Sequence, residues 1–124
     1  AIPRRNPINV VVDTKTMLQS LERVSVVISE KLKSPVRCIF EDDKVTMSAK
    51  TASGDAKDVC RIAGDGQGLE IGFNNRYLMD ALRYAPADTV KMELNTGISP
   101  AIIVPVEGEE NFLYMVLPVR LKVN

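Results

Sequence analysis

One apolar stretch dominates the second half of the chain: Asn111-Phe112-Leu113-Tyr114-Met115-Val116-Leu117-Pro118-Val119-Arg120-Leu121. It predicts a strand, and proline limits where that strand can lie, because it has no backbone N–H to donate to a sheet. We therefore expect the strand to begin inside a sheet and to leave it at Leu117 and Pro118. The apolar residues beyond, Val119 and Leu121, would then lie near the surface and could receive a partner's side chains. A plain terminal strand with a frayed end is the alternative.

The composition is that of an ordinary globular domain. The 124 residues are 45% apolar and 26% charged, which is enough for one domain with a real core. Lys and Arg balance Asp and Glu at 16 each, so any attraction to DNA must come from charge placed on one face. We find no signal-peptide pattern and no apolar run that could span a bilayer, and expect a cytoplasmic protein with no membrane role. The opening residues, Ala1-Ile2-Pro3-Arg4-Arg5, suggest a piece of a longer protein.

The residues of most catalytic and metal sites are missing from the sequence. There is no histidine, and Cys38 and Cys60 lack zinc-ligand spacing, so we expect two buried thiols in a reducing cytosol. The glycines of 64–68 lack the Lys-Ser/Thr ending of a phosphate loop, and the acidic residues of 41–43 and 107–110 fit solvated turns. We therefore expect no catalytic residue, metal or cofactor. An enzyme that uses an unusual carboxylate or lysine remains an alternative.

The hydrophobic pattern predicts a strand, a helix and three strands, in that order and twice over. The predicted helices begin after the caps Asp13 and Asn74, and run from Thr14 to about Lys31 and from Arg76 to about Ala85. The predicted strands are Ile8–Val12, Val36–Phe40, Val45–Ala49, Ala56–Ile62, Leu69–Phe73, Val90–Leu94, Ala101–Val106 and the final stretch. Residues 63–68 are predicted to be a flexible connector between the two halves.

The two halves also match residue by residue, which indicates an internal duplication. At an offset of 61 residues the matching pairs are Asp13 with Asn74, Lys15 with Arg76, Met17 with Leu78 and Leu21 with Leu82. At an offset of 54 they are Val36 with Val90, Arg37 with Lys91, Cys38 with Met92 and Phe40 with Leu94. The different offsets predict a first helix about two turns longer. We expect an α+β domain of two pseudo-symmetric βαβββ units, about 8–62 and 69–121, with two helices on one side of antiparallel sheets.

Two motifs carry a resemblance to a known family. The stretch Gly72-Phe73-Asn74-Asn75-Arg76-Tyr77-Leu78-Met79-Asp80-Ala81-Leu82 and the tail Tyr114–Leu121 resemble the C-terminal domain of the bacterial DNA polymerase III beta subunit, the sliding clamp. The tail is similar to the family's closing phrase, Tyr-Val-Val-Met-Pro-Met-Arg-Leu, and Ile2-Pro3 is similar to its entry into the third domain. The resemblance covers the whole chain and implies one DNA-clamp-like domain over residues 1–124, the third of a longer subunit.

The resemblance also implies a function without catalysis. Sliding clamps are DNA polymerase processivity factors: two subunits close into a homodimeric ring around duplex DNA, without sequence preference. They dock short peptide motifs of the DNA polymerase III alpha subunit, the clamp loader, other polymerases and repair proteins. Carried over to this chain, the peptide pocket comprises Asn74, Tyr77, Ile98, Ser99, Pro100, Met115, Val116, Leu117, Pro118, Val119, Arg120 and Leu121, with Ala1 at its edge. Leu117 and Val119 stand where methionine is common, and residues 122–124 run past the usual end.

Two further surfaces follow from the resemblance. The outward helix faces would approach DNA through Lys15, Gln19, Arg23, Arg76 and Arg83. Val26 and Val27 would lie at a contact between two subunits. An apolar residue is unexpected at position 26, because this position falls opposite the buried face of the predicted helix. Ordinary solvated residues are the alternative for both surfaces. For the pocket, the alternatives are that Tyr77 is a core aromatic, or that the chain is a peptide-binding module with no DNA role.

Overall fold

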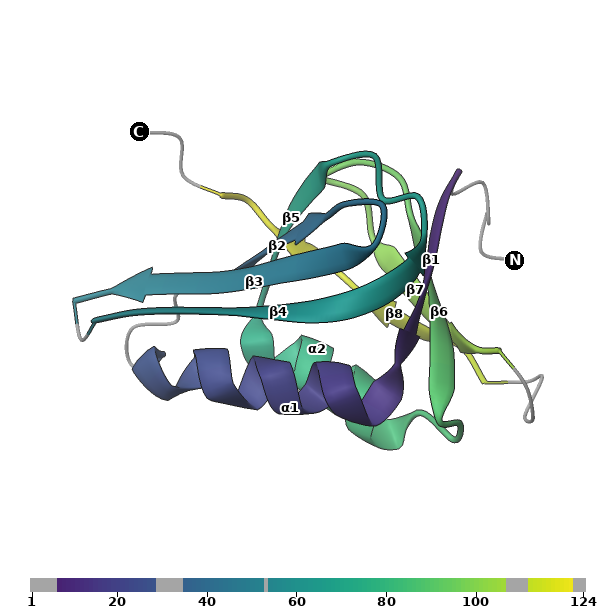
Figure 1. The fold of residues 1–124 in the computed structure, drawn as a ribbon, viewed down its shortest axis with the longest axis horizontal. Helices are drawn as coiled ribbons and strands as arrows, with labels where there is room; N and C mark the ends of the chain where they lie inside the picture. Colours follow the sequence, from purple (N-terminus) through teal and green to yellow (C-terminus); the bar gives the residue numbers. More distant parts are fainter. Residues whose placement is uncertain (1–6, 29–34, 53, 107–111, 122–124) are drawn as a thin grey trace.

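The computed structural model describes residues 7–28, 35–52, 54–106 and 112–121, and gives the α+β fold expected from the sequence (Figure 1). The helices are α1 (Thr14–Val24) and α2 (Asn75–Tyr84), and a 3₁₀ turn (Ser25–Val27) follows α1. The strands are β1 (Ile8–Asp13), β2 (Val36–Phe40), β3 (Lys44–Thr51), β4 (Gly54–Gly64), β5 (Leu69–Phe73), β6 (Thr89–Leu94), β7 (Ala101–Pro105), β8 (Tyr114–Val116) and β9 (Pro118–Val119).

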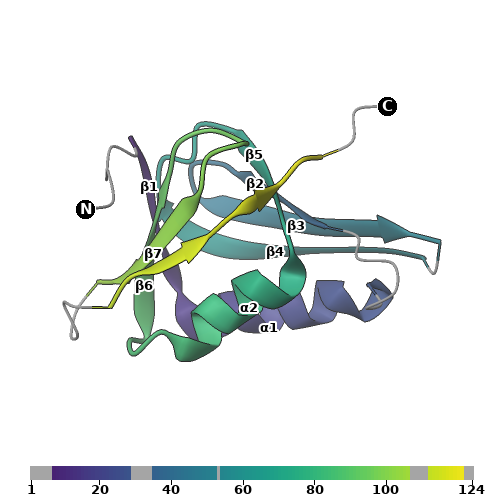
Figure 2. The same cartoon turned by 180° about the vertical axis from the view of Figure 1, so that it is seen from behind.

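All the strand pairs are antiparallel, in the order β8-β7-β6-β1-β4-β3-β2-β5-β9. The long strand β4 connects the two halves of this order, because it pairs with β3 and also, through Ile62–Gly64, with β1. Both helices lie side by side on the same side of the strands, as predicted (Figures 1 and 2). One hydrophobic core fills the space between the strands and the helices.

The two units exchange their first strands. β1 pairs with β6, the strand that follows the helix of the second unit, and β5 pairs with β2, the strand that follows the helix of the first. Between β1 and β6 the pairs are Ile8 with Leu94, Val10 with Met92, and Val12 with Val90. Their equivalents between β5 and β2 are, in the same order, Leu69 with Phe40, Ile71 with Cys38, and Phe73 with Val36. Each pair maps onto its equivalent by the offsets of 61 and 54 residues found in the sequence, so the pseudo-two-fold relation extends to the strand register.

Both predicted helix caps are confirmed. The carboxylate of Asp13 accepts a hydrogen bond from the backbone N–H of Thr16, and the side chain of Asn74 accepts from those of Arg76 and Tyr77. Each bond satisfies an N–H that has no partner within the first helical turn. The apolar faces that these helices bury are Met17, Leu21 and Val24 in α1, and Leu78, Ala81 and Leu82 in α2.

The prediction of a longer first helix is wrong. α1 has 11 residues and α2 has 10, because α1 ends at Val24 and the backbone is already extended at Ile28, with φ −99° and ψ 121°. β-branched side chains dominate this segment and lose rotamer freedom in a helix, which favours an early end. Ile28 still packs against the core, but from extended backbone. Its spacing of four residues from Val24 is the spacing that another turn of helix would have, so the sequence pattern predicted a longer helix. Lys31 lies outside the described residues.

The final stretch also differs from its prediction. β8 pairs with β7, a single residue, Leu117, follows, and β9 then pairs with β5. The chain therefore passes from one end of the strand order to the other instead of leaving the sheet (Figure 2). The equivalent strand of the first unit, β4, makes the same passage without interruption. Pro118 accounts for the break, because it has no N–H to continue the ladder. Asn111 lies outside the described residues.

The predicted connector at residues 63–68 begins as strand and makes a backbone contact with the β2–β3 turn. β4 extends to Gly64, and the buried Gly66 donates a backbone hydrogen bond of 3.1 Å to the carbonyl oxygen of Glu41. The expectation of two buried thiols is confirmed, and burial raises the pKa of Cys38 to about 12. Neither helix in the described part of the chain is long and apolar enough to cross a membrane.

Candidate functional site

Four large apolar side chains are exposed on or beside the segments that the sequence predicted to form a pocket. Their exposed fractions are 57% for Tyr77, 74% for Ile98, 39% for Met115 and 64% for Leu117. We call these four residues the exposed apolar cluster. A single exposed apolar side chain is common on protein surfaces, whereas a group of them indicates an interaction site.

Strand pairing brings the segments of this cluster together. Val116 pairs with Ala101, which directly follows the loop of Ile98 and its neighbours. Pro118 pairs with Phe73, which directly precedes the cap of α2. Leu117 stands between these two paired residues, so it lies between the β6–β7 loop and the start of α2. The cluster is therefore assembled from three parts of the second unit that are distant in sequence.

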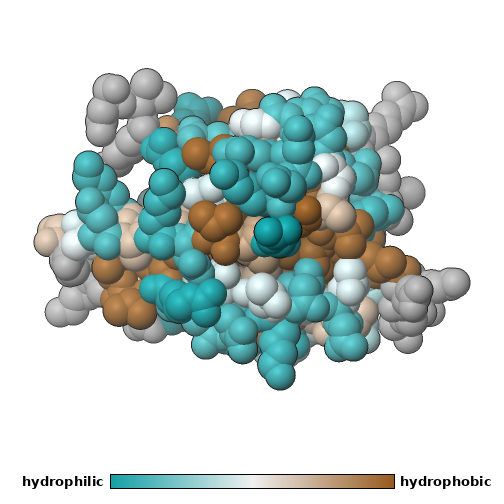
Figure 3. Space-filling view, in the orientation of Figure 1, coloured by the Kyte–Doolittle hydropathy of each residue, from teal (hydrophilic) through white to brown (hydrophobic). Residues whose placement is uncertain are grey.

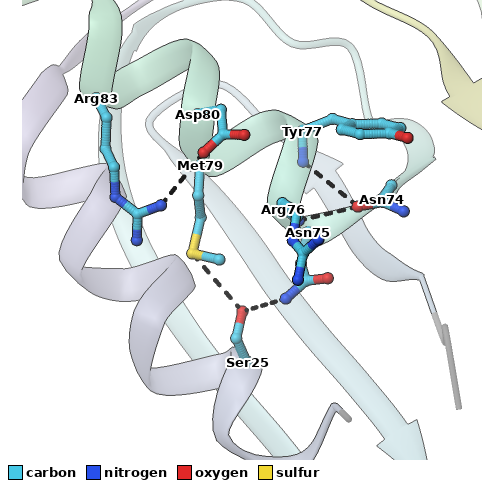
Figure 4. A network of polar contacts seen from close by, with 8 residues as sticks. All are labelled: Ser25, Asn74, Asn75, Arg76, Tyr77, Met79, Asp80 and Arg83. Atoms are coloured by element: carbon cyan, nitrogen blue, oxygen red, sulfur yellow. Dashed lines mark hydrogen bonds and ion pairs between the residues drawn. The ribbon is translucent and has the colours of Figure 1, made fainter. Parts of the chain in front are cut away.

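The start of α2 orients Tyr77. The side-chain oxygen of Asn74 accepts hydrogen bonds from the backbone N–H groups of Arg76, at 3.0 Å, and Tyr77, at 3.3 Å. The Tyr77 ring points away from α1 and lies on the same side of α2 as the Asn74 amide (Figure 4). The hypothesis that Tyr77 is a core aromatic is therefore wrong.

The β6–β7 loop is held by its own hydroxyl groups. The hydroxyl oxygens of Thr96 and Ser99 lie 2.7 Å apart and share a hydrogen bond, and the backbone N–H of Ile98 donates to Thr96 Oγ1 at 3.3 Å. Ser99 is thus engaged within the loop, while the Ile98 side chain is left outside. Nothing in the sequence alone indicated this arrangement.

The remaining predicted pocket residues differ in exposure. Val116 is 1% exposed and belongs to the core, so it can support this surface from below but cannot contact a ligand. Arg120 is exposed, and those of intermediate exposure are Asn74, Ser99, Pro100, Pro118, Val119 and Leu121. Alternation along a strand explains why Met115 is exposed while Val116 is buried. Ala1 and residues 122–124 lie outside the described residues.

All five residues predicted to face DNA are exposed on the helices: Lys15, Gln19, Arg23, Arg76 and Arg83. Arg23 and Arg83 each have an acidic partner. Arg23 lies 2.7 Å from Asp58 on β4, and Arg83 lies 3.3 Å from Asp80 one turn earlier on α2 (Figure 4). Sequence periodicity did not reveal the first pair, because its members are far apart in the chain.

The two helices are tied to each other by Ser25. Its hydroxyl oxygen accepts a hydrogen bond of 3.0 Å from the side-chain amide of Asn75, and lies 3.9 Å from the sulfur of Met79 (Figure 4). This contact joins the end of α1 to the start of α2.

The two valines predicted to lie between subunits are not equivalent. Val26 is 82% exposed, whereas Val27 is partly buried against the core and its carbonyl oxygen accepts a hydrogen bond of 2.8 Å from the Thr51 hydroxyl. Apolar surface is visible beside the end of α1 in Figure 3. Val26 is therefore the side chain that is available for a contact.

The acidic turn of Glu41, Asp42 and Asp43 concentrates negative charge. A hydrogen bond with Asp65, and repulsion by this and neighbouring carboxylates, raises the pKa of Asp42 above its usual value. Within residues 7–28, 35–52, 54–106 and 112–121, no group of three or more Cys, Asp and Glu side chains is arranged to hold a metal ion. Glu107, Glu109 and Glu110 lie outside those ranges.

Comparisons with known proteins agree on one family. The family described as "DNA polymerase III beta subunit, C-terminal domain" matches residues 1–120. The beta sliding clamp of Synechocystis is 34% identical over 122 residues, which are 97% of this chain and 31% of that protein. The crystal structure of the Thermotoga maritima DNA polymerase III beta subunit has a TM-score of 0.88 at 30% identity, over 98% of this chain and 33% of that one.

The Caulobacter crescentus beta sliding clamp has a TM-score of 0.90 at 26% identity, over 97% of this chain and 32% of that chain. The chain thus spans about a third of the length of the relatives it matches.

Proposed function

Because the chain belongs to the family formed by the C-terminal domain of the DNA polymerase III beta subunit, we propose that it acts as the third domain of a sliding clamp. In this role it is a non-catalytic part of a processivity factor, which closes into a homodimeric ring around duplex DNA and docks short peptide motifs of its partners. The exposed apolar cluster at the junction of β8 and β9 carries the proposal.

Peptide docking fits the chemistry of this cluster. Tyr77, Ile98 and Leu117 offer apolar area, and the Asn74 amide beside Tyr77 offers polar contacts. Buried aromatic and aliphatic anchors supply most of the energy of such interfaces. The partners proposed are polymerases, the clamp loader and repair proteins. A related clamp, from Caulobacter crescentus, was crystallised with polyethylene glycol in the region thought to tether beta motifs.

A DNA role fits the placement of charge on the helices. Lys15 and Arg76 occupy equivalent positions under the duplication and are exposed on α1 and α2. Contacts to phosphate alone would allow sliding, because phosphate carries no sequence information. Glu22 and Asp80 lie on the same helices and would keep each contact weak, so the closed ring would supply most of the retention on DNA.

Primer extension tests the proposal as a whole. The full protein, its own polymerase and its clamp loader are combined on a singly primed circular template. The proposal predicts long products with the wild type and short products with Leu117→Ser, while that variant still stays on nicked circular DNA. Val106→Ser is the control, since Val106 is also an exposed apolar residue but follows β7 away from the cluster.

Two results would count against the proposal. Products of Leu117→Ser as long as those of the wild type would remove the docking role. A wild type that binds partner peptides but is never retained on circular DNA would instead favour a peptide-binding module with no DNA role.

A further inference from the structure

Strand β5 lies against the β6–β7 loop, which carries Ile98, and against the C-terminal tail, which carries Leu117. At each of these two contacts a glycine stands where a side chain would not fit. The first is Gly97, in the β6–β7 loop next to Ile98. A Cβ atom built on Gly97 would lie 2.8 Å from the backbone carbonyl oxygen of Glu70 in β5. Real Cβ atoms essentially never come closer than 3.0 Å to such an atom, so a side chain here would force the loop away from β5.

The second position is Gly72, which lies in β5 itself, two residues after Glu70. A Cβ atom on Gly72 would lie 2.7 Å from the carbonyl oxygen of Val119 and 2.6 Å from Cδ2 of Leu121. Val119 is the strand partner of Gly72, and Leu121 lies over the same glycine. The absence of a side chain therefore lets the tail lie directly against β5.

The first unit shows that the fold itself does not require this glycine. At an offset of 61 residues, Gly72 corresponds to Val11 in β1. Val11 pairs with Ala63 in the same way as Gly72 pairs with Val119. A β-branched residue is thus accepted at the equivalent position of the first unit. Glycine in the second unit serves the placement of the tail.

From these contacts we propose that Gly72 and Gly97 are positioning residues for peptide docking, a role that rests on the function proposed above. They hold the tail and the β6–β7 loop at a fixed distance from β5, so that Leu117 and Ile98 present their side chains together. The residue that caps α2, Asn74, directly follows β5 and orients Tyr77. One short strand thus sets the position of three members of the cluster.

The test measures peptide affinity and stability in the full protein. The probe is a fluorescent peptide in which a glutamine precedes a leucine and a phenylalanine, and binding is followed by anisotropy. We expect Gly97→Ala and Gly72→Ala each to weaken binding by about tenfold or more, which corresponds to about 1.4 kcal/mol. Binding suffers because the anchors must fit their partner together, and a displaced loop or tail separates them.

Gly68→Ala is the matched control. Gly68 has a φ of +72° and no atom within 4 Å of an added Cβ, so alanine there strains the backbone without crowding β5. This variant should have a lower melting temperature and an unchanged peptide affinity. It separates a loss of stability from a loss of positioning.

Methyl NMR spectra of the peptide-free proteins give a second readout. Gly97→Ala should shift the Ile98 signals and leave those of Leu117 in place, and Gly72→Ala should do the reverse. Affinities within about twofold of the wild type for both variants would overturn the positioning role and leave the docking function intact. A wild type without affinity for the peptide would refute the docking function itself. If Gly72→Ala does not fold, Gly97→Ala decides alone.

Discussion

The guanidinium of Arg23 lies 2.7 Å from the carboxylate of Asp58 and fastens the end of α1 to β4. Burial by itself would raise the pKa of Asp58, but hydrogen bonds from Arg23, from Ser20 and from the backbone N–H of Val59 outweigh it and lower that pKa. As a partly exposed pair it contributes about 0–1 kcal/mol to stability. Its larger consequence is that the charge of Arg23 is already engaged by a carboxylate.

This pairing predicts unequal roles for the cations on α1. In the closed ring, Lys15→Ser should lower the salt dependence of DNA binding by about one unit of slope, because one phosphate contact is lost. Arg76→Ser, at the equivalent position of α2, should act similarly. Arg23→Ser should have a smaller effect. Affinity for nicked circular DNA is measured over a series of salt concentrations.

Lys57→Ser is the control for this experiment, since Lys57 is exposed on the opposite face of β4 from Asp58. It should leave the slope unchanged. Equal slopes for the wild type, Lys15→Ser and Arg76→Ser would show that these helices do not face DNA.

The two ends of α2 offer a paired test of the docking surface, because Tyr77 and Tyr84 are both exposed. Tyr77→Ser should weaken peptide binding by about tenfold or more, as expected for an aromatic anchor. Tyr84→Ser should leave the affinity unchanged. In an NMR titration of the wild type, the signals of Tyr77, Leu117 and Val119 should move. Shifts confined to a distant surface would contradict the assignment.

Val26 provides a test of self-association. Its side chain is largely exposed, so Val26→Asp should leave the melting temperature of the fold nearly unchanged. In the full protein it should nevertheless produce monomers in sedimentation velocity, because a buried, unpaired carboxylate disfavours an interface. Val106→Asp, another change at an exposed valine, should remain dimeric. A dimeric Val26→Asp protein would refute the proposed contact between subunits.

The two helix caps should differ in their dependence on pH. Hydrogen bonds from the Thr16 hydroxyl and backbone N–H lower the pKa of Asp13 below its usual value. A carboxyl group whose pKa is lower in the folded than in the unfolded protein stabilises the fold at pH values above its unfolded-state pKa. This contribution is lost as the pH falls through its folded-state pKa. Asp13→Ala should therefore cost about 0.5–2 kcal/mol at pH 7, and less at pH 3.

The control is Asn74→Ala, which removes a cap that does not titrate. Its cost should be similar at both pH values, as measured by urea unfolding. A cost of Asp13→Ala that does not fall with pH would mean that the capping carboxylate contributes no pH-dependent stability.

Several features of the protein followed from the sequence by itself. Asp13 and Asn74 predicted both helix caps, and the side chain of each caps its helix. The two offsets predicted the fold class, and they are reproduced in the strand register. These features depend on residues close in sequence, or on a duplication that the chain still carries, so the pattern of residues is sufficient to find them.

Other features were decided by the tertiary structure. Pro118 indicated that a strand ends, but the pairing of the next residues with β5 depends on an edge formed far away in the sequence. α1 ends early, yet Ile28 still packs against the core from extended backbone, and periodicity cannot distinguish this arrangement from another helical turn. The cluster around Leu117 exists only because the chain pairs with β7 just before this residue and with β5 just after it. Local preference sets which element forms, whereas long-range pairing and burial decide where each side chain lies.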